Sequence, residues 1–283
     1  MTPKGREEER LGGAPVYAAS AQTLGAVGTG IVSCVGTDFD DIHVAHLASC
    51  GIVTTGLYRR GPHSTQIITT ESEDGSRSQD AVSVASKIEG KDLHREHLSA
   101  STIYFSPTIS EVSCSCLKAA AGSEAIVALE VAGCLRTVGS YGALRYSVPD
   151  DIDDFLAYTT VLLVDPLSLS LLTESASEKD SVESLLGRGP FIVIVNRDVH
   201  GSTVYCHHGA IDIPYVVPSR VVDMSGYSHM YMIGFLIEFL RSGGELSRSG
   251  HFGAACASVS SAGRGPFAVI SRYEVERLLR SLY

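Results

Sequence analysis

The segment from residue 220 to residue 243, RVVDMSGYSHMYMIGFLIEFLRSG, constrains the fold more than any other part of the chain. Two β-branched residues, Val221 and Val222, lead into a turn that ends at Gly226, and apolar residues then recur at helical spacing from 230 to 240. This pattern predicts a loop that delivers the N-terminus of a buried helix. The unpaired N–H groups and positive dipole of such an end favour a phosphate or a developing negative charge.

Composition favours a single α/β domain over residues 12–283, because 283 residues that are 44% hydrophobic can bury one large core. The charged residues 1–11 ahead of it have no periodicity and are expected to form a disordered tail. A net charge of -10 argues against binding to nucleic acid or to an anionic membrane. The longest apolar run is too short to cross a bilayer. Seven scattered cysteines and no recognisable signal peptide favour the reducing cytoplasm.

Residues 223–229, DMSGYSH, resemble the D-T-x-G-A-G-D signature of the pfkB/ribokinase family of carbohydrate and nucleoside kinases. Asp223, Ser225 and Gly226 are in register, Tyr227 and Ser228 stand at the Ala and Gly positions, and His229 stands at the position of the catalytic Asp. The resemblance implies that residues 226–228 form the anion hole and that residue 229 is the base. The catalytic candidates are therefore His229, Gly226, Tyr227 and Ser228.

Two further motifs bring substrate-binding candidates. The Gly12-Gly13 turn, an Ala-rich helix to residue 27 and a strand over 28–36 are similar to the first signature of the family, in which an Asn touches the sugar; Tyr17 takes that place. The run EVAGCLR resembles the D-x-Q-G-x-x-R motif of the inositol-kinase branch. The implied substrate-binding residues are Gly12, Gly13, Tyr17 and Arg136.

Donor and metal positions also follow from the resemblance. Asp165 stands at the start of the family's N-x-x-E, and would hold a metal-bound water. The loop VNRDVHG stands at V-T-x-G-x-x-G, and its cofactor-binding candidates are Asn196, Asp198 and Gly201. A "dG.R" element is represented by Asp74, Gly75 and Arg77. These positions imply ATP and Mg²⁺ as cofactors.

The expected fold is ribokinase-like, an α/β three-layer arrangement with a mostly parallel sheet flanked by helices and a reduced β lid over residues 52–70. Buried strands are predicted at 102–106, 126–130, 161–165, 191–195 and 203–205, with helices at 40–51 and 251–262 and a capping box of Ser271 and Glu274. The family has an additional strand with a substrate-binding Asp ahead of the Gly-Gly turn. Its absence indicates either a truncated start or the loss of an inner strand.

Function remains open between two hypotheses. By resemblance, the reaction is phosphorylation of a sugar, polyol or nucleoside hydroxyl by ATP, with His229 as the base; a helix dipole that disfavours imidazolium would help it accept a proton. Altered anion-hole, metal and nucleotide positions favour weak or lost turnover, and the alternative is a pseudokinase that binds a nucleotide, a small polyol or a protein. An unpaired lid edge would also allow a homodimer.

Overall fold

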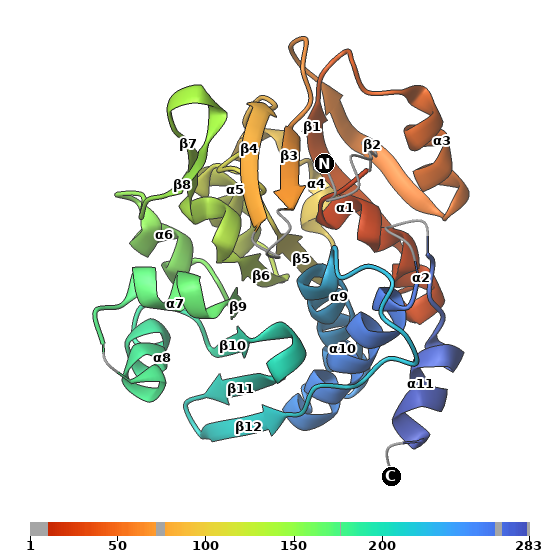
Figure 1. The fold of residues 1–283 in the computed structure, drawn as a ribbon, viewed down its shortest axis with the longest axis vertical. Helices are drawn as coiled ribbons and strands as arrows, with labels where there is room; N and C mark the ends of the chain where they lie inside the picture. The colour runs from red at the N-terminus through yellow and green to blue at the C-terminus, as the bar shows by residue number, and fades with distance from the viewer. Residues whose placement is uncertain (1–10, 72–76, 176, 264–267, 282–283) are drawn as a thin grey trace.

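The computed structural model describes the whole chain except residues 1–10, 72–76, 176, 264–267 and 282–283. The tail predicted for residues 1–11, apart from Leu11, and the positions Asp74 and Gly75 therefore lie outside the described residues. Figure 1 shows helices on both sides of a central sheet, with the β3 and β4 strands lying over one end of it.

The central sheet has six strands in the order β12-β11-β10-β9-β6-β5. The four strands from β5 to β10 are parallel, and β11 and β12 continue the sheet as antiparallel strands. The mostly parallel sheet predicted from the sequence is thus confirmed. The strands are β5 (Thr102–Phe105), β6 (Ile126–Glu130), β9 (Val161–Val164), β10 (Ile192–Asn196), β11 (Ser202–Cys206) and β12 (Gly209–Ile213).

Alternate residues of the buried strands face two different hydrophobic clusters. In β9, Val161 and Leu163 pack with the helices α9 and α10, whereas Leu162 and Val164 pack with α5 to α8 on the opposite face. Such burial on both faces explains the continuous apolar runs in the sequence. The helices are α5 (Cys114–Ala121), α6 (Ile152–Ala157), α7 (Pro166–Leu172), α8 (Glu178–Leu186), α9 (Tyr227–Arg241) and α10 (Leu246–Ser261).

The N-terminal part forms a separate parallel pair of strands. β1 (Thr29–Val35) pairs with β2 (Ile52–Arg59), and α3 (Asp41–Ser49) connects them. The Ala-rich helix predicted from residue 12 is divided into α1 (Ala14–Tyr17), a 3₁₀ turn η1 (Ala18–Ser20) and α2 (Ala21–Leu24). β2 therefore belongs to this pair rather than to the lid, which corrects the expected lid range of 52–70.

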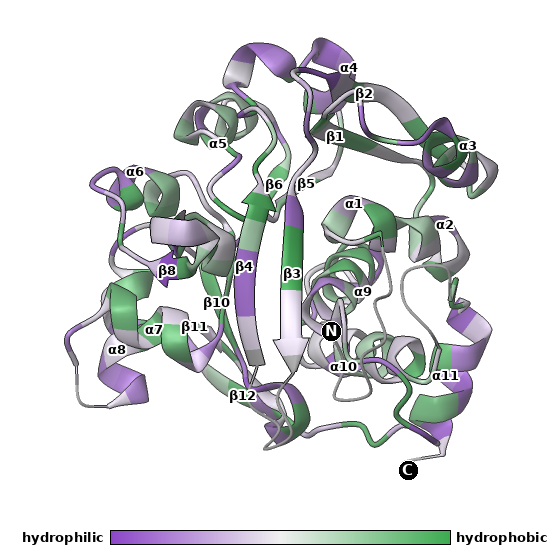
Figure 2. Ribbon diagram, turned by 45° about the horizontal axis from the view of Figure 1, so that its top comes forward, coloured by the Kyte–Doolittle hydropathy of each residue, from purple (hydrophilic) through white to green (hydrophobic). Residues whose placement is uncertain are grey.

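The lid consists of two hairpins. β3 (Gln66–Glu71) pairs with β4 (Arg77–Ser83), and β7 (Arg136–Val138) pairs with β8 (Leu144–Tyr146). An antiparallel bridge between Asp80 and Ala143 joins them. The β3–β4 hairpin lies in front of β5 and β6 in two views (Figures 1 and 2). It carries exposed apolar side chains, among them Ile68 at 49% exposure and Val82 at 60%.

The remaining short elements connect these layers. They are η2 (Gly90–Asp92), α4 (Arg95–Leu98), η3 (Val131–Leu135), η4 (Ser140–Gly142) and η5 (Asp198–His200). The C-terminal helix α11 (Arg272–Arg280) begins with the predicted capping box, in which Ser271 and Glu274 bond each other's backbone N–H groups.

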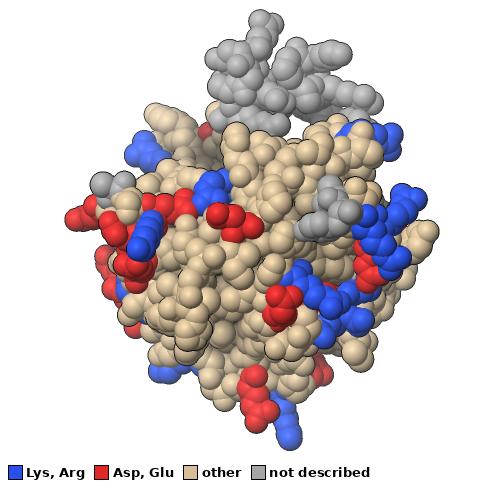
Figure 3. Space-filling model, turned by 90° about the horizontal axis from the view of Figure 1, so that it is seen from below, with Lys and Arg blue, Asp and Glu red and all other residues tan. Residues whose placement is uncertain are grey.

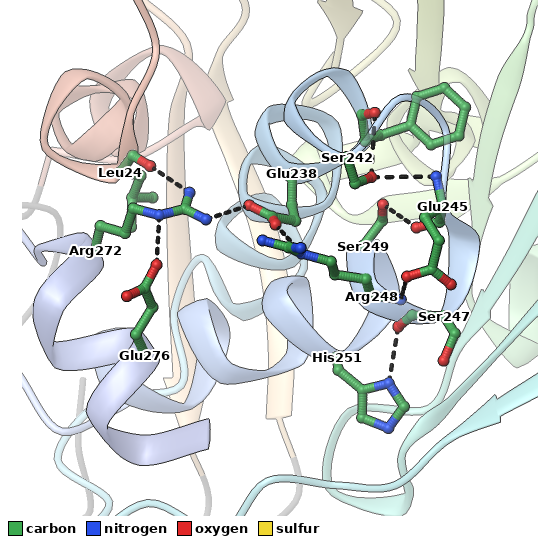
Figure 4. Close-up of polar contacts among 11 residues, drawn as sticks. Leu24, Glu238, Ser242, Glu245, Ser247, Arg248, Ser249, His251, Arg272 and Glu276 are labelled. Carbon is green, nitrogen blue, oxygen red and sulfur yellow. Dashed lines mark hydrogen bonds and ion pairs between the residues drawn. The ribbon is translucent and has the colours of Figure 1, made fainter. Parts of the chain in front are cut away.

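A buried carboxylate links the last three helices. Glu238 of α9 is 1% exposed in its side chain, and it accepts from Arg272 of α11 at 2.5 Å and from Arg248 of α10 at 2.5 Å (Figure 4). Arg272 also donates to Glu276 and to the carbonyl of Leu24, so one guanidinium joins α11, α9 and α2. This network anchors α11 to the body.

Basic and acidic side chains are interspersed on the face seen from below (Figure 3). Within the described part of the chain, no helix is both long and apolar enough to span a membrane.

Candidate functional site

The predicted loop and helix N-terminus are present at α9. Gly226 is the N-cap residue and has a left-handed backbone, with φ 76° and ψ 10°. Asp223 shapes the preceding turn, since its Oδ1 accepts from the N–H of Ser225 at 2.9 Å. The first turn of a long buried helix is thereby held at the carboxyl edge of the sheet, where open α/β folds place ligands.

The ring of Tyr17 lies directly on this loop. A Cβ atom built on Gly226 would be 2.0 Å from the ring carbon Cζ of Tyr17, so the ring packs against the bare backbone of this glycine. Tyr17 is 4% exposed, and its ring centroid is 5.5 Å from that of His229. It belongs to α1, which follows the Gly12-Gly13 turn and uses Gly13 as its N-cap. The structure thus places Tyr17 over the candidate anion hole.

The aromatic residue that follows Gly226 in the chain, Tyr227, lies in the core. Tyr227 is 5% exposed and packs in the core, with its ring centroid 6.3 Å from that of Tyr215. Burial, with nearby Tyr215, Asp198 and Tyr231, raises the pKa of its phenol. The ring of Tyr17 thus packs against Gly226, and the ring of Tyr227 packs beside that of Tyr215.

His229 is held by a buried carboxylate from the neighbouring part of the sheet. Its Nδ1 lies 2.8 Å from Oε2 of Glu130, at the end of β6. The hydroxyls of Tyr104 and Ser106, from β5 and the loop after it, donate to the same oxygen at 2.6 Å and 2.8 Å. The side chains of Glu130 and His229 are 15% and 22% exposed. The structure brings four polar groups together at the carboxyl ends of β5 and β6.

Electrostatics keeps Glu130 ionised. Burial alone would raise its pKa, but the charge of His229 and hydrogen bonds from His229, Tyr104 and Ser106 outweigh burial and lower the pKa to about 2. An ionised carboxylate only accepts hydrogen bonds, so Nδ1 of His229 carries the hydrogen. Nε2 can accept a proton only while the ring is neutral.

The loop after β10 is tied to the same helix. Asn196 donates from Nδ2 to Oγ of Ser228 at 3.3 Å, and its Oδ1 accepts from the N–H of Asp198 at 3.1 Å. Of the three cofactor candidates, Asn196 therefore contacts the anion-hole candidate Ser228, and Asp198 is bonded to Asn196. The third, Gly201, permits close packing of backbone, because a Cβ there would be 2.6 Å from the carbonyl oxygen of Ile213.

Acidic residues near this loop fit a weakly held divalent cation. Burial, followed by the charges of Asp165 and Glu130, raises the pKa of Asp198. Among the described residues, no three His, Cys, Asp or Glu side chains are close enough to form a metal cage. Mg²⁺ commonly uses one or two carboxylates, water and substrate phosphates instead. In the structure Oδ1 of Asp165 caps α7, where it accepts from the N–H of Ser168 at 2.6 Å.

Arg136 lies at a different place. It begins β7 and lines a cavity with Lys87, Glu111 and residues at the base of the lid. Sequence reasoning missed the partners of His229, namely Tyr104 and Ser106, and it treated Glu130 only as part of a motif. The available signal was position, since all three residues lie at or just beyond the carboxyl ends of adjacent parallel strands.

The elements described above define the class of fold: an α/β protein with a lidded, mostly parallel sheet and a helix N-terminus at the carboxyl edge of that sheet. A family model described as pfkB family carbohydrate kinase matches residues 3–268. The chain belongs to the pfkB family of carbohydrate kinases. No curated protein matches the sequence.

Solved structures show the same fold at low sequence identity. The nucleoside kinase of Methanocaldococcus jannaschii, an archaeal member of the ribokinase family, is 22% identical with a TM-score of 0.78, covering 98% of this chain and 89% of that one. The ribokinase of Arabidopsis thaliana, complexed with ribose and ATP, is 20% identical with a TM-score of 0.77 over 98% and 89% of the chains. A pyrophosphate-dependent kinase in the ribokinase family, complexed with a pyrophosphate analogue and myo-inositol, is 18% identical with a TM-score of 0.80 over 96% and 94%. The ribokinase-like fold predicted from the sequence is therefore confirmed, and family and fold together support a kinase-like function toward sugars or nucleosides.

Proposed function

We propose that this protein is a feeble carbohydrate kinase-type phosphotransferase in which His229, oriented by Glu130, replaces the catalytic Asp of its family. The observation that carries the proposal is the 2.8 Å contact between Nδ1 of His229 and the ionised carboxylate of Glu130. A carboxylate that holds one ring nitrogen fixes the ring, so that the other nitrogen can take a proton. The acceptor is the hydroxyl of a sugar, polyol or nucleoside.

The residues of the chain have separate roles in this reaction. Nε2 of His229 takes the proton of the acceptor hydroxyl, and Glu130 stabilises the imidazolium that forms. The amides of residues 226–228 and the dipole of α9 stabilise negative charge on the transferred group. Asp165 and Asp198 would hold Mg²⁺ through water, and Asn196 positions Ser228. When bound, the donor and its metal supply the phosphoryl group and neutralise its charge.

The position of Tyr17 supports low turnover. Its ring rests on Gly226, where the reacting groups of donor and acceptor would have to approach the loop amides. Phosphoryl transfer depends on positioning and on charge stabilisation. Covering this loop therefore lowers the rate of transfer more than exchanging one base for another. The same contact favours a second candidate, a pseudokinase that binds a nucleotide or a polyol without turnover.

Two further features of the proposal concern the donor and the compartment. One structural neighbour is described as pyrophosphate-dependent and another is complexed with ATP, so both donors belong in any assay. The seven cysteines are free thiols, which supports a reducing compartment such as the cytoplasm.

The test is phosphoryl transfer from Mg-ATP and from Mg-pyrophosphate to a panel of sugars, inositols and nucleosides. The natural protein is compared with His229→Ala and His229→Asp. Slow transfer by the natural protein, reduced about 10²- to 10⁴-fold in His229→Ala, is the expected result. Transfer that is unchanged in the folded His229→Ala variant would remove His229 from the reaction. Absence of phosphoryl transfer by all three folded proteins would favour the pseudokinase.

A further inference from the structure

Within the part of the chain that the structure describes, the imidazole ring of His229 makes its polar contacts through one nitrogen. Nδ1 lies 2.8 Å from Oε2 of Glu130, 3.3 Å from Oγ of Ser106 and 3.5 Å from the hydroxyl oxygen of Tyr104. No described residue forms a hydrogen bond with Nε2. The side chain is also 22% exposed, so Nε2 keeps an available electron pair while the ring is neutral.

The first turn of α9 provides backbone N–H groups beside this ring. The N–H of Tyr227 is already bonded within the protein, because it donates to the carbonyl oxygen of Met224 at 3.2 Å. Among the described residues, no acceptor is bonded to the N–H groups of Gly226, Ser228 or His229. Unpaired N–H groups at the positive end of a helix dipole are suited to the oxygens of a phosphoryl group.

Tyr17 contacts both the loop and the neighbourhood of the ring. It packs against the backbone of Gly226, where an added Cβ would be 2.0 Å from Cζ of Tyr17, and its ring centroid is 5.5 Å from that of His229. Gly226 and His229 therefore border the same space at the start of α9. A phosphoryl group held by the loop amides would lie next to the imidazole, and the bulk of Tyr17 limits the room left for an acceptor molecule.

Glu130 can stabilise the charge that the ring would gain on forming a bond at Nε2. When one nitrogen of a neutral imidazole bonds to phosphorus, the ring becomes positive, and a carboxylate at the other nitrogen stabilises that charge. The hydroxyls of Tyr104 and Ser106 hold this carboxylate in place by donating to Oε2 at 2.6 Å and 2.8 Å. A neutral ring also approaches an anionic phosphate without the repulsion that a carboxylate at residue 229 would meet.

We propose that His229 is a nucleophile as well as a base, and that Nε2 accepts the terminal phosphoryl group of a phosphoanhydride donor to form a phosphohistidine. The Nε2–P bond forms as the P–O bond to the leaving ADP or phosphate breaks, and the electron pair of that bond leaves with the oxygen. Nδ1 keeps its hydrogen, which remains bonded to Glu130. This inference rests on donor binding in the proposed function and goes beyond it, since direct transfer to an acceptor needs no covalent intermediate.

A hydroxyl group then removes the phosphoryl group from His229. The oxygen of water, or of a sugar, polyol or nucleoside, bonds to phosphorus, the N–P bond breaks, and its electron pair returns to Nε2. The proton of the hydroxyl passes to Nε2 and then to water, which restores the neutral ring. Because Tyr17 restricts access beside His229, this step is slow, and the phosphorylated protein should accumulate when no acceptor is present.

Labelling of the full chain tests the proposal. The protein is incubated with Mg²⁺ and either ATP radiolabelled in its terminal phosphoryl group or radiolabelled pyrophosphate, without any acceptor. The natural protein should take up label that is lost in acid and retained in alkali, as for a phosphohistidine and opposite to a serine phosphate. Mass spectrometry of peptides should place the added phosphoryl group on His229. The donor that labels the protein faster distinguishes a nucleoside triphosphate from pyrophosphate.

Variants connect the label to the ring and its carboxylate. His229→Gln should reduce labelling about 100-fold or more, because an amide has no comparable nucleophilic electron pair. Glu130→Gln should slow labelling about ten-fold or more. The matched control is His207→Gln, a change of an exposed histidine between β11 and β12, which should be labelled like the natural protein. Each variant is first shown to be folded by circular dichroism. If Glu130→Gln does not fold, His229→Gln and the peptide assignment still decide the result.

The outcomes separate this inference from the proposed function. Transfer to an acceptor by a protein that takes up no label would overturn the phosphohistidine and retain the kinase activity. Label on another residue, or equal labelling of the folded His229→Gln variant, would also overturn it. Acid-labile label on His229 without transfer to any acceptor would retain the inference and remove the kinase activity. Neither label nor transfer would overturn both.

Discussion

Nδ1 of His229 lies 2.8 Å from Oε2 of Glu130, although the two residues are 99 positions apart in the chain. The contact joins the first turn of α9 to the end of β6, and Tyr104 and Ser106 donate to the same carboxylate oxygen. A helix terminus and a sheet edge are thus connected by one ionised group that is largely removed from water.

Replacing Glu130 by Gln should destabilise the protein at pH 7 by about 2 to 4 kcal/mol. The change removes a buried charge that accepts from three donors and places an NH₂ group among them. Chemical unfolding followed by circular dichroism measures the loss. The matched control is Glu124→Gln, an exposed change just before β6, for which about 0.5 kcal/mol or less is expected. Equal losses in the two variants would contradict the role given to the contact.

Acid should destabilise the fold by protonating the carboxylates of Glu130 and Asp92. A bidentate pair with Arg60, at 2.6 Å and 2.8 Å, outweighs burial and lowers the pKa of Asp92 to about 2. Both folded-state pKa values lie below the usual values of 3.8 and 4.5, so the stabilisation is present above about pH 5 and is lost as the pH falls toward 2.

Urea unfolding between pH 7 and pH 2.5 tests this prediction. Asp92→Asn should lower stability at pH 7 and flatten the acid dependence. Asp150→Asn, an exposed change, should reproduce the natural curve. An Asp92→Asn curve that keeps its full acid dependence would show that the pair with Arg60 does not contribute to it.

The contact between Tyr17 and Gly226 can be measured as a coupling energy. Gly226→Ala should cost about 2 to 4 kcal/mol, because the left-handed backbone disfavours a Cβ and because this Cβ would overlap the Tyr17 ring. Part of the loss should disappear in a Tyr17→Ala background, with a coupling of about 1 to 3 kcal/mol in the double-mutant cycle. Gly28→Ala, where no atom lies within 4 Å, is the control. If the losses in free energy of unfolding of the two single variants simply add in the double variant, the contact between the ring and the loop does not contribute to stability.

The two arginines on Glu238 should differ in importance. Arg272 has an 18% exposed side chain and bonds three groups, whereas Arg248 is 61% exposed and bonds Glu238 from the solvent side. Arg272→Ala should therefore cost about 3 to 5 kcal/mol and loosen α11, whereas Arg248→Ala should cost about 1 kcal/mol or less. Hydrogen exchange of the α11 amides and thermal unfolding measure these effects. Similar losses of stability in the two variants would show that the exposure of the arginine does not determine how much its ion pair with Glu238 contributes.

Much of the fold could be predicted from local patterns. The runs that become β6, β9 and β10 are apolar up to the terminal Glu130 of β6 and Asn196 of β10, because both faces of the sheet are covered. The start of α9 follows from the turn before its apolar spacing. The edge strand β12 was not predicted, since its sequence GAIDI is short and is interrupted by Asp212. The start of α10 at Leu246 was also missed: the polar residues 247–249 and Gly250 conceal a helix that was expected from residue 251.

The site was less predictable than the fold. The resemblance singled out Gly226, Ser228, His229 and Asn196, which the structure places at one edge. The contacts of Tyr17 with Gly226 and of Glu130 with His229 join segments far apart in the chain, and no local spacing encodes them. The separation of Arg136 from His229 likewise depends on the path of the loop around Gly133.

The most direct test is the rate of phosphoryl transfer by Tyr17→Asn and Tyr17→Phe, each shown to be folded, with Mg-ATP or Mg-pyrophosphate and the acceptor panel. Tyr17→Asn uncovers Gly226, so a rate at least ten-fold above that of the natural protein is expected, and a further His229→Ala change should abolish the gain. Tyr17→Phe keeps the ring and should stay as slow as the natural protein. Rapid transfer by the natural protein, on the order of 1 to 100 per second as in ordinary kinases, or a Tyr17→Asn variant no faster than Tyr17→Phe, would contradict the account.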